Sequence, residues 1–328
     1  MKAKKWLLIS LTTLSVTLFS NFLFLYVTDY YGVSNPTNPR QHSGYNQRFV
    51  LVEYMLKNLE KYDTLLFGSS RLQFINPLHI KDRKAYNMTV AEGIPHEHLL
   101  LLKLFLKNGM KLKEVVLALD DFSYQVSFDK HQNIPDTKSH YLATNISKFD
   151  FYKTYYFRKL SKLDYLHLKN IYNDTSPYER HYKIIFNQEE AFTSKHAEYN
   201  QPKPDNPIYN IPTLYDGNEI KSTIKDIKEI IKICKENDIN LKVFINPMHH
   251  TTYKLSNLKR LEKFKKELSY ITPYYDFTVQ SEISKDNSYW IETSHYTLEV
   301  GDMILSRIYD NNTSIKDFGI YVEKKERK

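Results

Sequence analysis

A chain of 328 residues with 41% hydrophobic, 26% charged and 14% aromatic residues can bury a substantial core in one large domain or two small ones. This composition excludes a disordered chain, a collagen-like repeat and a small disulfide scaffold. The single cysteine, Cys234, excludes an intrachain disulfide and a multi-cysteine zinc cluster. The net charge of +8 is spread over helical patterns, and its dense clusters lie at the two termini, which does not favour nucleic-acid binding.

The N-terminal region predicts a membrane anchor. Three lysines within the first five residues precede an uncharged stretch of 22 residues, Trp6 to Val27, and about 20 apolar residues cross a bilayer as a helix. The lysines favour a cytoplasmic N-terminus, and the stretch lacks the small-residue cleavage pattern of a signal peptide. We therefore expect residues 1–28 to form a cytoplasmic stub and an uncleaved, single-pass signal anchor in the cytoplasmic (inner) membrane. The rest of the chain is then extracytoplasmic.

Short apolar runs alternate with helical patterns through much of the remaining chain. The runs at 64–67, 115–119 and 241–245 are typical of buried strands. The patterns at 96–107 and 220–234 are typical of helices with one apolar face. This alternation predicts an α/β domain built on a parallel sheet.

The composition also predicts where this domain begins and ends. Residues 29–46 are rich in turn formers and predict a linker, and residues 47–315 form the α/β domain. Residues 122–215 interrupt the alternation and are rich in Tyr, Lys, Asn and His, so they predict an insertion with helical stretches near 150–170. Residues 316–328 predict a frayed basic tail.

Two short segments carry residues suited to nucleophilic catalysis. A Gly-Ser-Ser-Arg sequence at 68–71 follows the first predicted strand, and a Glu-Thr-Ser-His sequence at 292–295 precedes the last predicted helix. In open α/β sheets, ligands bind beyond the carboxyl ends of the strands. A serine becomes nucleophilic when a base takes its proton and a third group orients that base. A carboxylate three residues before an imidazole can hold its Nδ1–H and leave Nε2 facing a serine.

The sequence at 68–71 after an apolar strand, with Glu292 and His295 near the C-terminus, resembles the SGNH (GDSL-like) hydrolase and acyltransferase superfamily. The resemblance implies a three-layer, flavodoxin-like parallel sheet that carries the insertion. It also implies that Ser70 is the nucleophile, His295 the base and Glu292 the orienting acid. The last block of the family is Asp-x-x-His, so Glu292 replaces an aspartate and lengthens the orienting acid by one methylene group.

Two further blocks depart from the family pattern. The N-x-x-x-x-G block starts at Asn87 and reaches its glycine one place late, at Gly93. The resemblance implies that Glu92 or Gly93 gives a backbone N–H to the oxyanion hole. The third block normally ends in an asparagine that contacts the oxyanion, but here the strand ends in Asp120 and Asp121. These carboxylates offer no amide and would repel an oxyanion if ionised.

Other strand-end residues have two interpretations each. Arg71 either binds an anionic substrate or forms a salt bridge to a helix. Asp120 and Asp121 either form an acid/base pair or make hydrogen bonds at the strand end. His249 and His250 either line the substrate crevice or are structural, and they lack a carboxylate at ligand spacing, which disfavours a metal site. No metal and no other cofactor is predicted. The insertion's tyrosines either pack as a core or stack on sugars.

The resemblance covers about residues 60–120 and 220–310, and it is strongest to a membrane-anchored branch that includes the alginate and teichoic-acid acylation proteins. It implies an extracytoplasmic acyltransferase or esterase, with acetyl as the default acyl group, acting on a cell-surface polysaccharide or related acylated polymer. The expected partners are this polymer, the membrane and a multipass membrane acyltransferase, without nucleic acid. The alternative is a catalytically silent SGNH-like module that binds glycan or a membrane partner in a surface-polymer modification or export complex.

Overall fold

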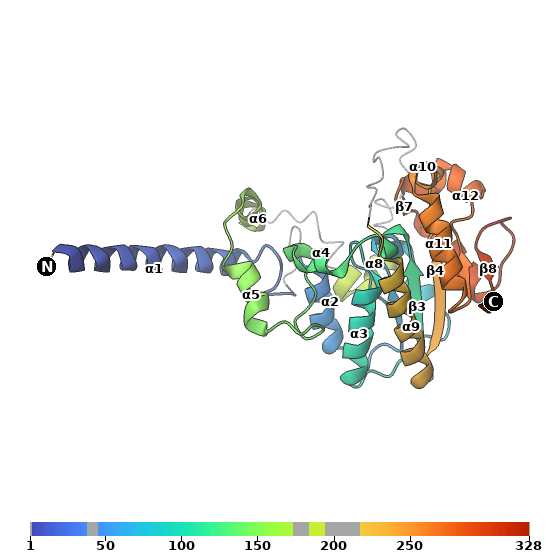
Figure 1. The fold of residues 1–328 in the computed structure, drawn as a ribbon, viewed down its shortest axis with the longest axis horizontal. Helices are drawn as coiled ribbons and strands as arrows, with labels where there is room; N and C mark the ends of the chain where they lie inside the picture. The colour runs from blue at the N-terminus through green and yellow to red at the C-terminus, as the bar shows by residue number, and fades with distance from the viewer. Residues whose placement is uncertain (1, 38–44, 173–183, 194–216, 328) are drawn as a thin grey trace. The chain divides into compact units, whose positions relative to one another are not determined.

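The computed structural model describes residues 2–37, 45–172, 184–193 and 217–327, drawn as a coloured ribbon in Figure 1. The chain divides into two compact units. A helical unit contains Met1–Tyr54 and Gln132–Asn187, and a sheet unit contains Met55–His131 and Gln188–Lys328.

The longest element of the helical unit is α1, Lys2–Thr28. It is long and apolar enough to cross a membrane, and its most apolar part is exposed. A helix of this kind near the N-terminus serves as a membrane anchor or a signal sequence. The unit also contains α5 (Lys148–Tyr156) and α6 (Lys162–Tyr172), which confirm the helices predicted near 150–170 and lie beside the C-terminal end of α1 (Figure 1).

The predicted linker over 29–46 is structured in its described parts. The Asp29 carboxylate accepts hydrogen bonds from the backbone N–H groups of Val33, Ser34 and Asn35 at 2.7–3.0 Å. The buried Asn46 side chain donates to the Tyr155 hydroxyl at 2.7 Å, and its Oδ1 atom accepts the Phe49 N–H of α2 (Gln47–Leu56) at 3.0 Å. These satisfied buried polar groups make residues 29–37 and 45–46 part of the helical unit.

A six-stranded sheet forms the centre of the sheet unit, with the strand order β2-β1-β3-β4-β5-β8. All neighbouring strands run parallel except β8, which runs antiparallel to β5. The prediction of an α/β domain with a parallel sheet is therefore confirmed. The strands are β1 (Thr64–Phe67), β2 (Ala85–Asn87), β3 (Glu114–Leu119), β4 (Asn240–Ile245), β5 (Tyr274–Asp276) and β8 (Ile320–Val322).

Helices pack against both faces of this sheet. Alternate strand residues, including Leu66 and Val116, share one buried cluster with Val300 and Ile304 of α13 (Leu298–Tyr309). The neighbouring residue Phe67 points to the opposite face, where its ring stacks on His98 of α3 at 5.4 Å. On that face α3 (Pro95–Lys107), α9 (Ile220–Glu236) and α11 (Leu258–Ser269) lie side by side (Figure 1).

Segments outside the predicted strands complete both sides of the sheet. Residues 316–327 are not the frayed tail that their charge predicts, because β8 pairs with β5 as the outer strand and the Lys325 N–H donates to the Ser269 carbonyl at 2.8 Å. At the other end, the side-chain amide of Gln188, the first residue of α8 (Gln188–Thr193), donates to the Asn87 carbonyl and accepts from the Asn87 N–H, both at 2.9 Å. This amide pairs with β2 as a neighbouring strand would.

The predicted insertion at 122–215 is divided between the units. Residues up to 131, with η3 (Asp121–Tyr124) and most of α4 (Phe128–Gln132), belong to the sheet unit. Residues 132–187 belong to the helical unit, and 194–216 lie outside the described residues. The remaining short elements are η1 (Ser70–Phe74), η2 (Pro77–His79), η4 (Pro135–Thr137), α10 (His250–Leu255), α12 (Glu282–Lys285), η6 (Asn287–Tyr289), β6 (Trp290–Glu292) and β7 (His295–Tyr296).

Candidate active site

A short helix places Ser70 directly beyond β1. The strand ends at Phe67, and Gly68 lies so close to β3 that a Cβ atom there would approach the Cβ of Ala118 to 2.9 Å. Ser69 then caps η1, because its hydroxyl accepts the Arg71 N–H at 3.3 Å. Ser70 is the first residue of η1, so its N–H has no carbonyl partner within the helix.

The segment at 292–295 forms a tight turn between β6 and β7. The Glu292 carboxylate accepts the Ser294 N–H at 2.8 Å within the turn. Two contacts from other elements fix the turn: the Thr252 hydroxyl of α10 donates to the Thr293 carbonyl at 2.6 Å, and Arg71 Nε donates to the Ser294 carbonyl at 3.0 Å. The turn is therefore tied both to α10 and to the helix that carries Ser70.

Ser70, His295 and Glu292 lie together at one point of the sheet edge. The Ser70 Oγ atom is 2.9 Å from His295 Nε2, although the two residues are 225 positions apart in the chain. On the other side of the ring, Nδ1 is hydrogen-bonded to Glu292 Oε1. The Ser70 and His295 side chains are only partly buried, so a substrate has access to them. This arrangement has the geometry of a nucleophile, its base and the group that orients the base.

The electrostatics of Glu292 fit this role. Burial alone would raise its pKa, but the hydrogen bond and charge of His295, the Ser294 N–H and the charge of Arg71 hold the pKa below its usual value. Glu292 is therefore ionised at neutral pH. An ionised carboxylate favours the tautomer with the proton on Nδ1 and leaves Nε2 to accept the Ser70 hydroxyl proton.

The neighbouring hydroxyl group, that of Ser69, has a different environment. It is fully buried and donates to Asp120 Oδ2 at 2.5 Å. Burial raises the pKa of Asp120 to about 7, against the lowering effect of nearby Arg71 and of hydrogen bonds from Ser69 and Asn246. Of the two serines, the structure thus brings only Ser70 to His295.

Arg71 forms a buried ion pair with the end of β3. Its Nη1 atom is 2.6 Å from Asp121 Oδ1 and 3.9 Å from Asp120 Oδ2. Burial would lower the pKa of Arg71, but the charges of Asp121 and Asp120 hold it above its usual value. The charge of Arg71 is paired and its Nε is bonded to the 292–295 turn, as the salt-bridge interpretation expects. Binding of an anionic substrate by Arg71 stays a prediction.

The loop after β2 packs closely behind Ser70. The Asn87 side chain donates to the carbonyls of Leu72 and Ile75 in and after η1, at 2.7 and 3.1 Å. The Gly93 N–H donates to the Val90 carbonyl at 3.3 Å, and a Cβ atom at Gly93 would lie 2.5 Å from the Gly68 carbonyl oxygen. Asn87 and Gly93 therefore hold η1 in place through close packing, and the Gly93 N–H is engaged within its own loop.

Glu92, a residue predicted to line the oxyanion hole, contacts a buried histidine through its side chain. Its backbone has a positive φ of 51°, and its Oε2 atom is 3.3 Å from His131 Nε2. The other ring nitrogen of the buried His131 is 2.9 Å from Glu97 Oε1. His131 thus links the loop to α3, a connection that the sequence did not indicate.

His249 and His250 lie at the start of α10. The Nε2 atom of His249 is 2.9 Å from Asn287 Oδ1, while Nδ1 accepts the Thr251 N–H at 3.3 Å. Burial lowers the pKa of His249, which keeps this ring neutral and suits a helix cap. The adjacent His250 ring lies 4.3 Å away, centroid to centroid. Among the described residues, no group of three or more His, Cys, Asp or Glu side chains is arranged to hold a metal ion.

Asn246 and Tyr296 lie behind the candidate site and were not predicted as part of it from the sequence. Asn246 follows β4, is fully buried, and its amide lies 3.4 Å from Asp120 Oδ2. The Tyr296 hydroxyl donates to the side-chain Oδ1 atom of Asn246 at 3.0 Å. Asn246 could have been selected by the rule that selected Asp120, because both residues directly follow a strand. No pattern in the sequence indicates Tyr296.

No protein-family model matches this chain, and no curated protein is significantly similar to it.

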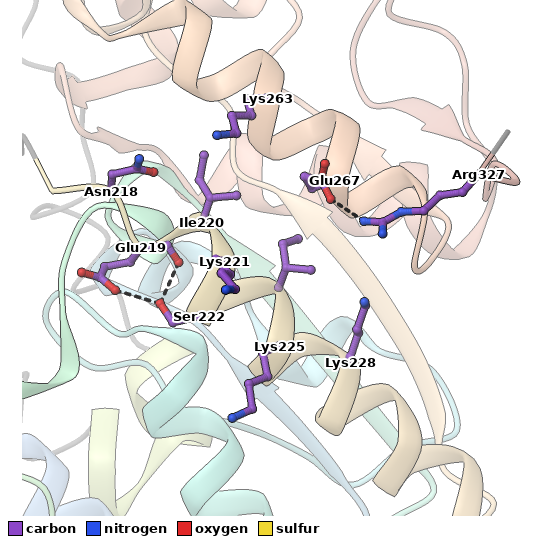
Figure 2. Close-up of a pocket in the computed structure, with 11 residues that line it drawn as sticks. Asn218, Glu219, Ile220, Lys221, Ser222, Lys225, Lys228, Lys263, Glu267 and Arg327 are labelled. Carbon is purple, nitrogen blue, oxygen red and sulfur yellow. Dashed lines mark hydrogen bonds and ion pairs between the residues drawn. The ribbon is translucent and has the colours of Figure 1, made fainter.

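A separate cavity of about 790 Å³ lies between α9 and α11, and its lining contains none of the three residues Ser70, Glu292 and His295. Figure 2 shows its charged lining, in which Glu267 pairs with Arg327 at 2.7 Å. Its cations outnumber its carboxylates, so it favours anionic ligands over cationic ones. The lysines around it are Lys221, Lys225, Lys228 and Lys263.

Proposed function

We propose that this protein is an extracytoplasmic, SGNH-like acyltransferase or esterase that acts on a cell-surface polysaccharide or related acylated polymer. The observation that carries the proposal is the approach of Ser70 Oγ to His295 Nε2 at 2.9 Å, with Glu292 on the other ring nitrogen. Acetyl is the expected acyl group because of the sequence resemblance.

The strand order supports an SGNH-type domain. The five parallel strands run β2-β1-β3-β4-β5, which is the order of flavodoxin-like sheets. Ligands bind such sheets where the strand order reverses, beyond the carboxyl ends of the strands. Here that point lies between β1 and β3, and Ser70 follows β1.

The proposed reaction proceeds in two steps. Ser70 Oγ attacks the acyl carbonyl carbon while His295 Nε2 takes the hydroxyl proton, and His295 then gives this proton to the departing alcohol oxygen. The product is an acyl ester on Ser70. In the second step His295 removes a proton from the acceptor, which attacks this ester, and Ser70 regains its proton. Water as acceptor gives hydrolysis, and a glycan hydroxyl gives transfer.

Charge on the tetrahedral intermediate needs hydrogen-bond donors next to Ser70. The N–H of Ser70 is the donor that the local geometry supports best, because it opens η1 and has no partner in the helix. Asn246 takes no part in this proposal, since its amide donates to the Leu119 carbonyl at 3.3 Å and to Asp120 Oδ2 at 3.4 Å.

Active-site labelling tests the proposal. The full-length protein in detergent, incubated with a fluorophosphonate probe, is expected to form a covalent adduct on Ser70 identified by peptide mass spectrometry. Ser70→Ala should abolish the adduct, and Ser69→Ala, the matched control, should retain it. A folded wild-type protein that shows no adduct, or an adduct that persists in Ser70→Ala, would overturn nucleophilic catalysis by Ser70.

The proposed location rests on α1 and its N-terminal lysines. A reporter enzyme that is active only after export, fused after residue 45, should be active, and a cytoplasmic reporter at the same position should be silent. The reverse result would place the domain in the cytoplasm and remove surface polymers as substrates. A multipass membrane acyltransferase is the proposed partner that brings the acyl group across the membrane.

A second candidate function is a catalytically silent SGNH-like module that binds glycan or a membrane partner. The observation in its favour is the pair of carboxylates, Asp120 and Asp121, at the strand end where the family carries an amide. This candidate predicts that Ser70→Ala supports polymer modification in cells as well as the wild type does. Loss of modification in Ser70→Ala would leave the catalytic function.

A further inference from the structure

The surface of α6 is inverted relative to that of a helix in water. The side chains of Asp164 and His167 are 0% and 1% exposed, whereas Leu163, Tyr165 and Leu166 are 52%, 55% and 44% exposed. Helices on water-facing surfaces place their apolar side chains inward and their polar side chains outward. The outer face of α6 is therefore suited to an apolar medium.

Specific contacts hold α6 in this orientation. The Arg158 guanidinium donates to both oxygens of the buried Asp164 carboxylate. The Ser161 N–H and hydroxyl each donate to the same carboxylate at 2.8 Å. The Arg158 guanidinium also lies over the Tyr31 ring, 4.9 Å from its centroid. Because these bonds satisfy the buried charge, the helix cannot turn its leucines inward without breaking them.

The same segment contacts the last turns of α1. Asn21 Nδ2 of α1 donates to the Arg158 carbonyl at 3.2 Å, and the rings of Phe24 and Tyr165 are 5.2 Å apart. Phe24 lies within the uncharged stretch that ends at Val27, about 4–5 Å before its end at 1.5 Å per residue. The exposed face of α6 thus lies at the level where the candidate membrane helix leaves the apolar part of a bilayer.

The surroundings of this face have the composition of a membrane interface. Phe157 is 61% exposed, and its ring is 5.8 Å from that of Phe22 in α1. Aromatic side chains gather at the level of lipid headgroups, and lysines there reach anionic phosphates. The exposed lysines of α5, α6 and their connection are Lys148, Lys153, Lys159, Lys162 and Lys169.

We propose that α5 and α6 form a second membrane contact, in which Phe157, Leu163, Tyr165 and Leu166 insert into the outer interface of the bilayer that α1 spans. The neighbouring lysines then contact anionic headgroups. This inference rests on α1 as the membrane helix and goes beyond the acyl chemistry of Ser70. Together, α1 and the α5–α6 surface fix the tilt and height of the helical unit relative to the bilayer. With α1 alone, the unit could change its tilt.

Depth-dependent fluorescence quenching tests this contact in the full chain. Single cysteines at Phe157→Cys and Leu166→Cys carry an environment-sensitive NBD label in vesicles of phosphatidylcholine and phosphatidylglycerol. The native Cys234 is buried, which raises its pKa to about 12 and keeps it unreactive. Leu14→Cys in α1 is the hydrocarbon control. Leu255→Cys in α10, 47% exposed, is the matched control for an exposed leucine in water.

We expect lipids with a shallow doxyl group to quench the labels at 157 and 166, and we expect aqueous iodide not to quench them. The label at 255 should be quenched by iodide alone. If the labels at 157 and 166 are open to iodide, or are quenched by neither agent, while the label at 14 lies in lipid, the second contact is absent and the anchor stands. If the label at 14 is not in lipid, both the α1 anchor and the second membrane contact are overturned. Fluorophosphonate labelling of Ser70 is independent of all these outcomes.

Discussion

The sheet unit and helix α6 of the helical unit distribute polar and apolar side chains in opposite ways. In the sheet unit the strands bury residues such as Leu65 completely, and the reactive polar groups lie at an accessible edge. In the helical unit α6 buries Asp164 and exposes Leu166. Burial of apolar surface is driven by water, so a helix with exposed leucines and a satisfied internal charge indicates another medium. The comparison supports the proposal that the outer face of α6 meets a different solvent from the surface of the sheet unit.

The two units also share one structural feature, a buried or half-buried arginine that bonds to two different segments. In each, a single arginine joins segments that are distant in sequence: Arg71 links β3 to the 292–295 turn, and Arg158 links α1 to α6. In the sheet unit this feature supports the reactive edge, and in the helical unit it supports the inverted surface. Variants at each site therefore test whether these contacts cause the contrast between the units.

The largest expected effect concerns the reactive edge. His295→Ala should slow fluorophosphonate labelling of Ser70 about 10³-fold, the scale of a lost general base. Glu292→Gln should slow it less, because the base remains but loses its orienting charge. The measurement is the second-order labelling rate near neutral pH, with Ser69→Ala, which loses the η1 cap but keeps Ser70 and His295, as the control that should be slowed much less than His295→Ala. Equal rates in wild type and His295→Ala would contradict activation of Ser70 by His295.

The next effect concerns pH and the carboxyl group behind the reactive edge. Burial raises the pKa of Asp120 from 3.8 to about 7, so the protonated form stabilises the fold fully below pH 3.8, and this contribution is lost as the pH rises through about 7. From pH 5 to pH 8 the wild type should lose about 2–3 kcal/mol of unfolding free energy relative to Asp120→Asn, which cannot ionise. Urea unfolding at both pH values measures this. Parallel pH profiles would show that Asp120 is ionised throughout.

A smaller effect is expected in the helical unit. Arg158→Met keeps the aliphatic stem but leaves Asp164 without its cation, which should destabilise the packing of α6 by about 2 kcal/mol, a buried-pair cost reduced because Arg158 is partly exposed. Faster hydrogen exchange of the α6 amides measures the loss. The double variant Arg158→Met with Asp164→Asn should recover part of it. Unchanged exchange in the single variant would mean that another contact orients α6.

The smallest effect concerns the close contact behind Ser70. Gly93→Ala places a methyl group against the Gly68 carbonyl, and we expect it to cost about 1–2 kcal/mol in unfolding free energy, as overpacking does. Gly109→Ala is the control, because Gly109 has open space around it but a φ of +89°. Its cost is conformational strain alone. A Gly93→Ala variant as stable as the wild type would show that the loop moves away freely.

The sequence was sufficient for the parts of the fold that have a repeating signal. The runs at 64–67 and 115–119 correspond to β1 and β3, which are buried along their whole length. The run at 241–245 corresponds to β4, which contains Lys242 and is buried only over its last three residues. The meeting of Ser70 and His295 was expected from the resemblance of two short motifs to a known superfamily; the strand-end rule placed Ser70 but not His295, since β7 lies outside the six-stranded sheet. These features have local patterns, so they could be predicted without coordinates.

The remaining features depend on partners that a local pattern does not contain. The bond between Ser69 and Asp120 requires the alignment of β1 with β3, in which Phe67 pairs with Leu117. The inverted orientation of α6 requires the cation of Arg158, which lies outside the helix. The strand at Ile320–Val322 is three residues within a charged segment, too short to give an alternating pattern.

The outer strands of the sheet have a consequence for the behaviour of the protein in concentrated solution. An uncovered outer strand offers a row of free amide and carbonyl groups on which another chain can assemble, and short outer strands limit this assembly. Here β8 is the outer strand on one side and is three residues long, and the Gln188 amide engages the backbone of β2 on the other side. Gln188→Ala would free the Asn87 backbone of β2 to pair with another chain. Light scattering at rising concentration would then reveal growing aggregates where the intact chain stays dispersed.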